Sequence, residues 1–308
     1  MKKLKFVVSL TNNDNDYQVE QASAAEKAAQ RLGVEAQIIH ASNDAILQSQ
    51  QLVKIVQSAK DKPDAIIVEP VGGTALPQVA RAAVMAGIGW VVLNRDAEYI
   101  SELRRAHRVP IFAITSDHEQ IGRLQGQQLG ALLPKGGSVL YVQGPSESLA
   151  AKQRAAGMYH SKPTNVDVKV IKGQWTEASA HKAVTSWLRL STSRESLVDV
   201  IAAQDDSMAM GAKKAFQELS DTAARERWAR VPYIGIDGVS TTGQSWVRSG
   251  LLTATIIVPA NTGQALELLS QAIQHGSTTP EQILTEPRSF PSIEELASSR
   301  ARTRSQSV

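Results

Sequence analysis

The sequence VDVIAA at residues 198–203 runs through Gln204 directly into the acidic pair Asp205 and Asp206. A second short apolar stretch, VPYIGI at residues 231–236, runs into Asp237 in the same way. Brief runs rich in Val and Ile are typical of parallel strands that are covered on both faces. Both stretches are therefore predicted as buried strands, and open α/β sheets bind ligands just past the carboxyl ends of such strands.

The acids that follow these strands have different predicted roles. Asp206 directly precedes the helix SMAMGAKKAFQEL at residues 207–219, and Asp is a preferred residue at a helix N-cap. A structural capping role is therefore favoured for Asp206. Asp205 and Asp237 are the better candidates for ligand binding.

Composition indicates an ordinary globular chain. Its 308 residues leave room for two domains, with 42% hydrophobic and 20% charged residues. The net charge of +3 does not predict nucleic-acid binding, because basic residues gather only in RARTR at 300–304, which is interpreted as a frayed, solvated terminus. The absence of Cys excludes disulfides and zinc-thiolate sites.

The first residues, MKKLK, resemble the basic end of a secretory leader. The apolar run after them, FVVSL, is shorter than the roughly 7 residues that a leader core needs, so it is predicted as a first strand. If the protein is exported, its leader is expected to be missing from this sequence. No stretch reaches the length of a membrane span.

Strand and helix patterns alternate along the whole chain, which predicts parallel sheets with right-handed crossovers. The charged stretch AEYISELRRAHR at 97–108 is predicted as a surface insertion, with a short helix as one form of it. The loop GGT at 72–74 is predicted to open a helix. The pattern starts again after residue 116. Strands are predicted in the first half at residues 4–10, 34–39, 65–70, 88–93 and 111–115.

The second half carries about one strand and one helix more than the first. The chain is therefore expected to cross back near Pro259, and ILTEPRSFP at 283–291 is expected to cross once more. The predicted fold is α/β, with two doubly wound parallel-sheet lobes joined by a three-crossing hinge. The predicted lobes are residues 1–115 with 259–287, and residues 116–258 with 288–308.

Five motifs in this order resemble the type I periplasmic sugar-binding proteins, with the ribose-binding proteins nearest, and the related effector core of the lac-repressor family. The resemblance covers about residues 4–290 and implies a monosaccharide held between the lobes. The motifs are LNR at 93–95, ITSD at 114–117, AAKQRAAGM at 150–158, AAQDDSMAMGA at 202–212 and GIDG at 235–238.

In the first lobe the resemblance implies two groups of ligand residues. Asn15, Tyr17 and Gln18 match the polar and aromatic residues that follow the family's first strand. Asn94 and Arg95 stand at the family's aspartate–arginine pair, so an amide replaces the acid.

In the second lobe the resemblance implies five more ligand residues. Arg154 and Trp175 match the family's arginine and its stacking aromatic residue, and Asp237 matches its aspartate. His118 and Asp205 both stand where ribose binders have Asn. The family's late hinge glutamine has no counterpart here. These departures leave the fold prediction intact but do not support ribose as the ligand.

These residue types suit a sugar on chemical grounds. Carboxylates accept and guanidinium groups donate pairs of hydrogen bonds to adjacent hydroxyls, and such charge-assisted bonds are strong. An inverted hydroxyl leaves buried groups unpaired, at about 1–3 kcal/mol each. An indole can cover the C–H face of the ring. Two acids beside two arginines would also leave the site near neutral.

Each candidate also has a structural interpretation. Arg154 is a surface helix residue in that interpretation, Trp175 covers the core, and His118 is only a neighbour of a helix N-cap. Tyr17 packs on its own helix, and Asp237 before Gly forms a turn.

The functional prediction is the solute-binding component of an ABC importer, periplasmic and monomeric, with permease subunits as partners and a monosaccharide or small polyol as ligand. No cofactor, metal or nucleic acid is expected. Enzyme activity is not predicted, because the sequence lacks HExxH, GxxxxGK[ST], GxSxG and a glycine-rich dinucleotide motif. A transcription regulator would need a helix-turn-helix ahead of the first strand. The alternative is a cytoplasmic sugar-sensing domain that signals to a partner protein.

Overall fold

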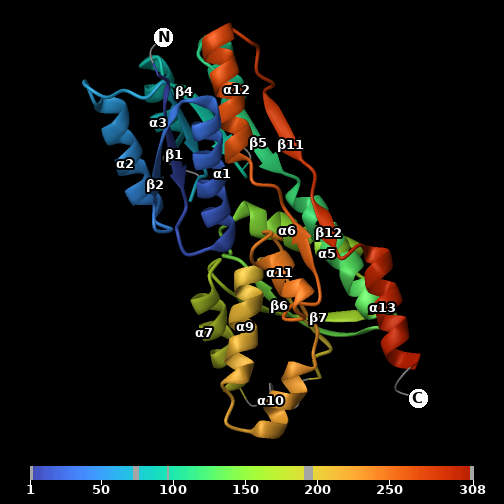
Figure 1. The fold of residues 1–308 in the computed structure, drawn as a ribbon. Coiled ribbons are helices and arrows are strands. Elements are labelled where there is room, and N and C mark those ends of the chain that lie inside the picture. The colour runs from blue at the N-terminus through green and yellow to red at the C-terminus, as the bar shows by residue number, and fades with distance from the viewer. Residues whose placement is uncertain (1–2, 72–75, 96, 191–196, 306–308) are drawn as a thin grey trace. The chain divides into compact units, whose positions relative to one another are not determined.

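The computed structural model describes residues 3–71, 76–95, 97–190 and 197–305 (Figure 1). The chain forms two compact units. Unit 1 comprises Met1–Ser116 and Ala260–Thr285, and unit 2 comprises Asp117–Pro259 and Glu286–Val308. The chain therefore passes from one unit to the other three times.

Unit 1 is built on a parallel sheet of six strands in the order β11-β5-β4-β3-β1-β2. The order reverses between β1 and β3, whose connections leave on opposite faces, and ligands of open α/β sheets bind at such a point. The strands are β1 (Lys5–Leu10), β2 (Glu35–His40), β3 (Ala65–Val68), β4 (Gly89–Leu93), β5 (Ile111–Ser116) and β11 (Gln282–Thr285).

Helices cover both faces of this sheet, which explains why its central strands are apolar on both sides. Helices α1 (Asp16–Leu32) and α12 (Thr262–His275) pack on the face that includes Phe6 and Val8. The opposite face, with Val7 and Ile66, is covered by α2 (Ala45–Gln57), α3 (Leu76–Met85) and α4 (Tyr99–Ala106).

Unit 2 repeats the arrangement on a parallel sheet in the order β7-β6-β8-β9, with its reversal between β6 and β8. A separate antiparallel pair joins β10 to β12. The strands are β6 (Gly137–Gln143), β7 (Val166–Lys172), β8 (Val200–Ala203), β9 (Tyr233–Ile234), β10 (Thr255–Ile257) and β12 (Arg288–Phe290).

The helices of unit 2 also lie on two faces. One core contains residues of α7 (Glu177–Leu188), α9 (Asp206–Gln217) and α10 (Thr222–Ala229), and the other those of α5 (His118–Leu132), α6 (Leu149–Ser161) and α13 (Ile293–Ser305). The short α11 (Gly243–Arg248) precedes β10. The predicted α/β fold class with doubly wound parallel sheets is thus confirmed.

One local prediction needs correction. The charged stretch at 97–108 forms the short helix that was one of its predicted forms, but it is not a surface insertion, because α4 buries Ile100 and Leu103 in the core beneath it. The backbone of residues 300–304, predicted as a frayed terminus, belongs to α13, whose Leu296 packs in the core of unit 2. The predicted GGT loop lies outside the described residues.

No described helix combines the length and apolar character that crossing a membrane requires. In the same part of the chain, no cluster of His, Cys, Asp and Glu is arranged to hold a metal ion.

Candidate functional site

The first polar cluster lies in unit 1, where β1 leads into α1. Asn15 caps this helix: its side-chain oxygen accepts from the backbone N–H groups of Tyr17, at 2.9 Å, and Gln18, at 3.3 Å. The cap fixes the first turn, so that Tyr17 and Gln18 are both buried.

Side-chain amides connect this turn to Asn94, the residue after β4. The Asn94 Nδ2 donates to the Tyr17 hydroxyl at 3.2 Å, and its Oδ1 accepts from Asn261 Nδ2 at 2.8 Å. Gln21 closes the network, because its Nε2 donates to both the Tyr17 hydroxyl and Asn261 Oδ1. Neither Gln21, inside α1, nor Asn261, the residue before α12, was a candidate from sequence, since no local pattern marks either of them.

A buried acid, Glu69, stands at the centre of this cluster. Gln18 Nε2 and Asn94 Nδ2 both donate to its Oε2, at 3.0 and 3.2 Å. Sequence reasoning missed this residue, although a signal existed. Glu69 directly follows the apolar strand AIIV, and Asp205 likewise follows the strand VIAA, one residue further on, after Gln204.

Arg95 lies half-buried beside the cluster. Its Nη1 donates to the backbone carbonyl of Asn94 at 2.7 Å. Asn94 itself has a φ of 55°, in the left-handed region that Asn tolerates better than most residues. The structure therefore brings Asn15, Tyr17, Gln18, Asn94 and Arg95 into one region of unit 1.

The acid after β8 that caps α9 is not the one that the sequence suggested. Asp205 is the N-cap of α9, with an extended backbone and a side chain that accepts from Met208 N–H at 2.5 Å. The prediction that Asp206 caps this helix is therefore wrong. Asp206 is structural in another way, because its carboxylate accepts from the Thr255 hydroxyl and, at 2.8 Å, from Gly238 N–H.

Arg154 organises the second cluster, in unit 2. It is 7% exposed, so it is not a surface helix residue. Its Nη1 lies 3.9 Å from Asp237 Oδ1 and also donates to the carbonyl of Gln204, while its Cζ lies 5.5 Å from the centre of the Trp175 ring. Its Nε has no hydrogen-bond partner among the described residues.

Gln204, whose carbonyl accepts from Arg154, is itself fixed by three side-chain hydrogen bonds. It was not a candidate from the sequence. Its Nε2 donates to the Tyr141 hydroxyl at 2.8 Å and to the Ala151 carbonyl at 2.9 Å. Its Oε1 accepts from Gly144 N–H at 2.9 Å. Burial raises the pKa of Tyr141, so its hydroxyl keeps its proton at physiological pH.

Two residues of this cluster have unusual backbones. Trp175 has a φ of 62° and Asp237 a φ of 111°, values that are costly for residues with a Cβ. Asp237 is held there by its main chain, which donates to Ile256 O at 2.9 Å and accepts from Val258 N–H at 3.0 Å. Gly144 makes room for the indole, because a Cβ on Gly144 would lie 2.5 Å from the Trp175 ring.

His118 is buried at the first turn of α5, directly after the N-cap residue Asp117. The structure thus places both Trp175 and Asp237 beside Arg154. It places Asp205 at a helix cap and His118 at a helix start.

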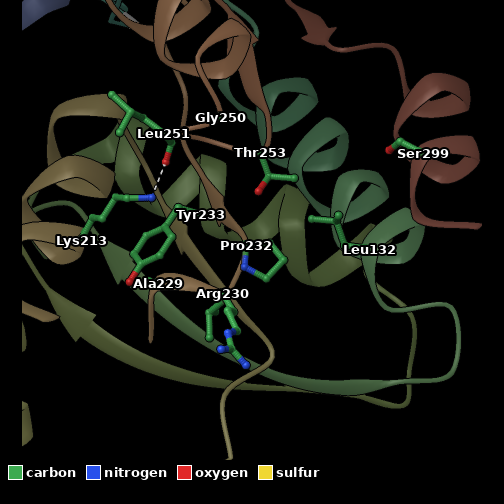
Figure 2. A pocket seen from close by; sticks show the side chains of 11 residues that line it. Leu132, Lys213, Ala229, Arg230, Pro232, Tyr233, Gly250, Leu251, Thr253 and Ser299 are labelled. Carbon is green, nitrogen blue, oxygen red and sulfur yellow. Dashed lines mark hydrogen bonds between the residues drawn. The ribbon is translucent and has the colours of Figure 1, made fainter. Parts of the chain in front are cut away.

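A separate hollow of about 290 Å³ lies in unit 2, and Figure 2 shows its lining. Lys213 borders it and donates to the Leu251 carbonyl at 2.8 Å, and burial lowers the pKa of this amine. Because Arg230, Pro232 and Tyr233 line it, the hollow lies at the start of β9, whereas Asp237 follows the end of that strand. None of the ten candidate residues lines it.

A family model for the periplasmic binding protein domain matches residues 6–277. The chain therefore belongs to this family of binding proteins. The resemblance inferred from five sequence motifs is confirmed.

Curated relatives are similar at low identity. The chain is 27% identical to a putative rhizopine-binding protein of Rhizobium meliloti, over 60% of this chain and 58% of that protein. It is 25% identical to a D-ribose/D-allose-binding protein of Pseudomonas aeruginosa, over 83% of this chain and 74% of the relative. The first match thus spans less than two thirds of the relative's length.

A solved structure shows the same fold. It is an ABC transporter periplasmic solute-binding protein from Actinobacillus succinogenes with bound D-allose, and the TM-score is 0.79 at 19% identity. The alignment covers 96% of this chain and 99% of that one.

Proposed function

We propose that the protein is the solute-binding component of an ABC importer and takes a monosaccharide or small polyol. The contact between Arg154, Trp175 and Asp237 carries this proposal. It combines a guanidinium, a carboxylate and an indole face, which are the groups that a polyhydroxylated ring needs. The relative named for D-ribose and D-allose supports the same ligand class, as does the similar solved structure with bound D-allose.

Both units contribute to this function in the proposal. Each has its polar cluster past the carboxyl ends of parallel strands, and the chain links the units by three passages. We propose that one ligand engages both clusters and that the units close on it as lobes about these passages. The ligand leaves chemically unchanged, the partners are permease subunits, and the setting is the periplasm.

A thermal-shift screen against pentoses, hexoses, deoxy sugars, amino sugars and polyols tests the proposal. A ligand at a hundredfold excess over its Kd stabilises the folded protein by about 2.7 kcal/mol. A compound that stabilises the protein should also reduce the protein's radius of gyration in small-angle scattering. The compound should be recovered chemically unaltered. A screen without any stabilising compound would contradict the proposed function, and a consumed ligand would indicate an enzyme.

A further inference from the structure

Glu69 is the one charged side chain that is buried among the described residues of unit 1, at 4% exposure. It lies directly after β3, beside the point where the strand order of the sheet reverses. A carboxylate in that place is expensive to keep away from water unless other groups satisfy it.

The two carboxylate oxygens of Glu69 have different surroundings. Oε2 accepts both amide hydrogen bonds, from Gln18 and Asn94. Oε1 accepts no hydrogen bond from the described residues. It is not one of the fully enclosed atoms without a hydrogen bond, so it must be accessible to solvent. No ion pair within the described ranges involves Glu69.

The groups that bond to Glu69 stabilise its charge without forming an ion pair with it, and Arg95, which lies beside the cluster, donates to the Asn94 carbonyl instead. The two donors on Oε2 are neutral amides, and the nearby first turn of α1 contributes only the partial positive charge of a helix N-terminus. A neutral hydroxyl on Oε1 would add a hydrogen bond and leave Glu69 without an ion-pair partner. An ammonium group would supply the hydrogen bond and the opposite charge together, and charge-assisted bonds of this kind are roughly twice as strong.

We propose that Glu69 selects a ligand that carries a protonated amine, an amino sugar or an amino-substituted polyol, whose ammonium group donates to Glu69 Oε1. This inference rests on the proposed function and narrows its ligand class. The amides of Gln18 and Asn94 then hold the carboxylate with Oε2 turned inward and Oε1 turned toward the ligand.

The test compares matched ligands that differ in one group. Calorimetry measures the affinities of glucosamine against glucose, galactosamine against galactose, and an aminocyclitol against inositol. We expect the amine of the best-fitting pair to bind at least about tenfold more tightly than its hydroxyl counterpart. Acetylation of the amine, which removes its charge, should abolish the preference.

The variant Glu69→Gln keeps the shape of the side chain and removes its charge. It should lose the amine preference while it still binds the neutral partner. The control is Glu102→Gln, which removes an exposed carboxylate that pairs with Arg81, and it should keep the preference. Thermal melting reports whether each variant is folded.

The outcomes separate the two proposals. Equal affinities of the parent protein for the two members of every pair would overturn the inference and leave sugar binding intact. A preference that survives in a folded Glu69→Gln variant would overturn it as well. If Glu69→Gln does not fold, the comparison of parent affinities alone decides. Failure of every amine and hydroxyl compound to bind would instead contradict the proposed function.

Discussion

The polar clusters of unit 1 and unit 2 are held in place by different means. In unit 1, side chains bond to side chains, through Tyr17, Gln21, Asn94 and Asn261. In unit 2, the main chain holds Asp237, and the Gln204 carbonyl holds Arg154. A network of amides limits which hydrogen bonds a ligand can make. A charged pair forms stronger hydrogen bonds to a ligand, and the strained backbone at Asp237 fixes where its carboxylate lies.

The largest expected effect comes from the removal of the cation in unit 2. Arg154→Leu removes the cation beside the buried Asp237 and the guanidinium group over the Trp175 ring. Ligand affinity should fall by an amount at the upper end of about 2–5 kcal/mol, since truncation of a buried charged group that bonds a ligand has that cost. Calorimetry with the screened ligand measures the loss. The surface variant Arg81→Leu serves as control, and a comparable loss in it would remove the assignment of Arg154.

A somewhat smaller loss is expected at Asp237. Asp237→Ala and Asp237→Gly should both weaken binding by about 2–5 kcal/mol. Their stabilities should differ, because Gly adopts a φ of 111° without strain and Ala does not, so the Gly variant should melt at a higher temperature. Unchanged affinity in both variants would exclude Asp237 from the site.

Removal of an amide from the network of unit 1 should lower the stability of the folded protein. Gln21→Leu has a similar volume but leaves the backbone N–H groups of Asn261 and Thr262, each 3.0 Å from Gln21 Oε1, without their acceptor. The free energy of unfolding should fall by about 2–3 kcal/mol. Chemical denaturation measures this, with the exposed Gln57→Leu as control. A variant as stable as the parent would show that these hydrogen bonds of Gln21 do not stabilise the fold.

The smallest expected effect concerns the indole of unit 2. Trp175→Ala should lose about 1–3 kcal/mol of affinity through lost apolar contact, and Trp175→Phe should retain most of it. Ligand titrations followed by Trp fluorescence should also show a smaller spectral change in both variants. Binding by Trp175→Ala at parental affinity would place the aromatic platform elsewhere, with Tyr17 the next candidate.

Sequence alone determined the fold class, because a β-strand buried on both faces must be apolar along its length, and such strands alternate here with amphipathic helices. It also identified most of the polar residues that follow those strands, since their position depends only on where the apolar run stops. The family resemblance came from the same positions. Element ends differ by a few residues, as at β8, which begins at Val200 rather than 198.

Only the tertiary structure decided how these polar residues are used. Which of two adjacent acids caps α9 depends on the backbone angles at Asp205, and local sequence is compatible with either. Gln21 and Gln204 acquire their roles from residues far along the chain, at separations that no local pattern encodes. Glu69 became a candidate only when the fold placed it against Gln18 and Asn94, because a hydrogen-bond network is a property of distances in space.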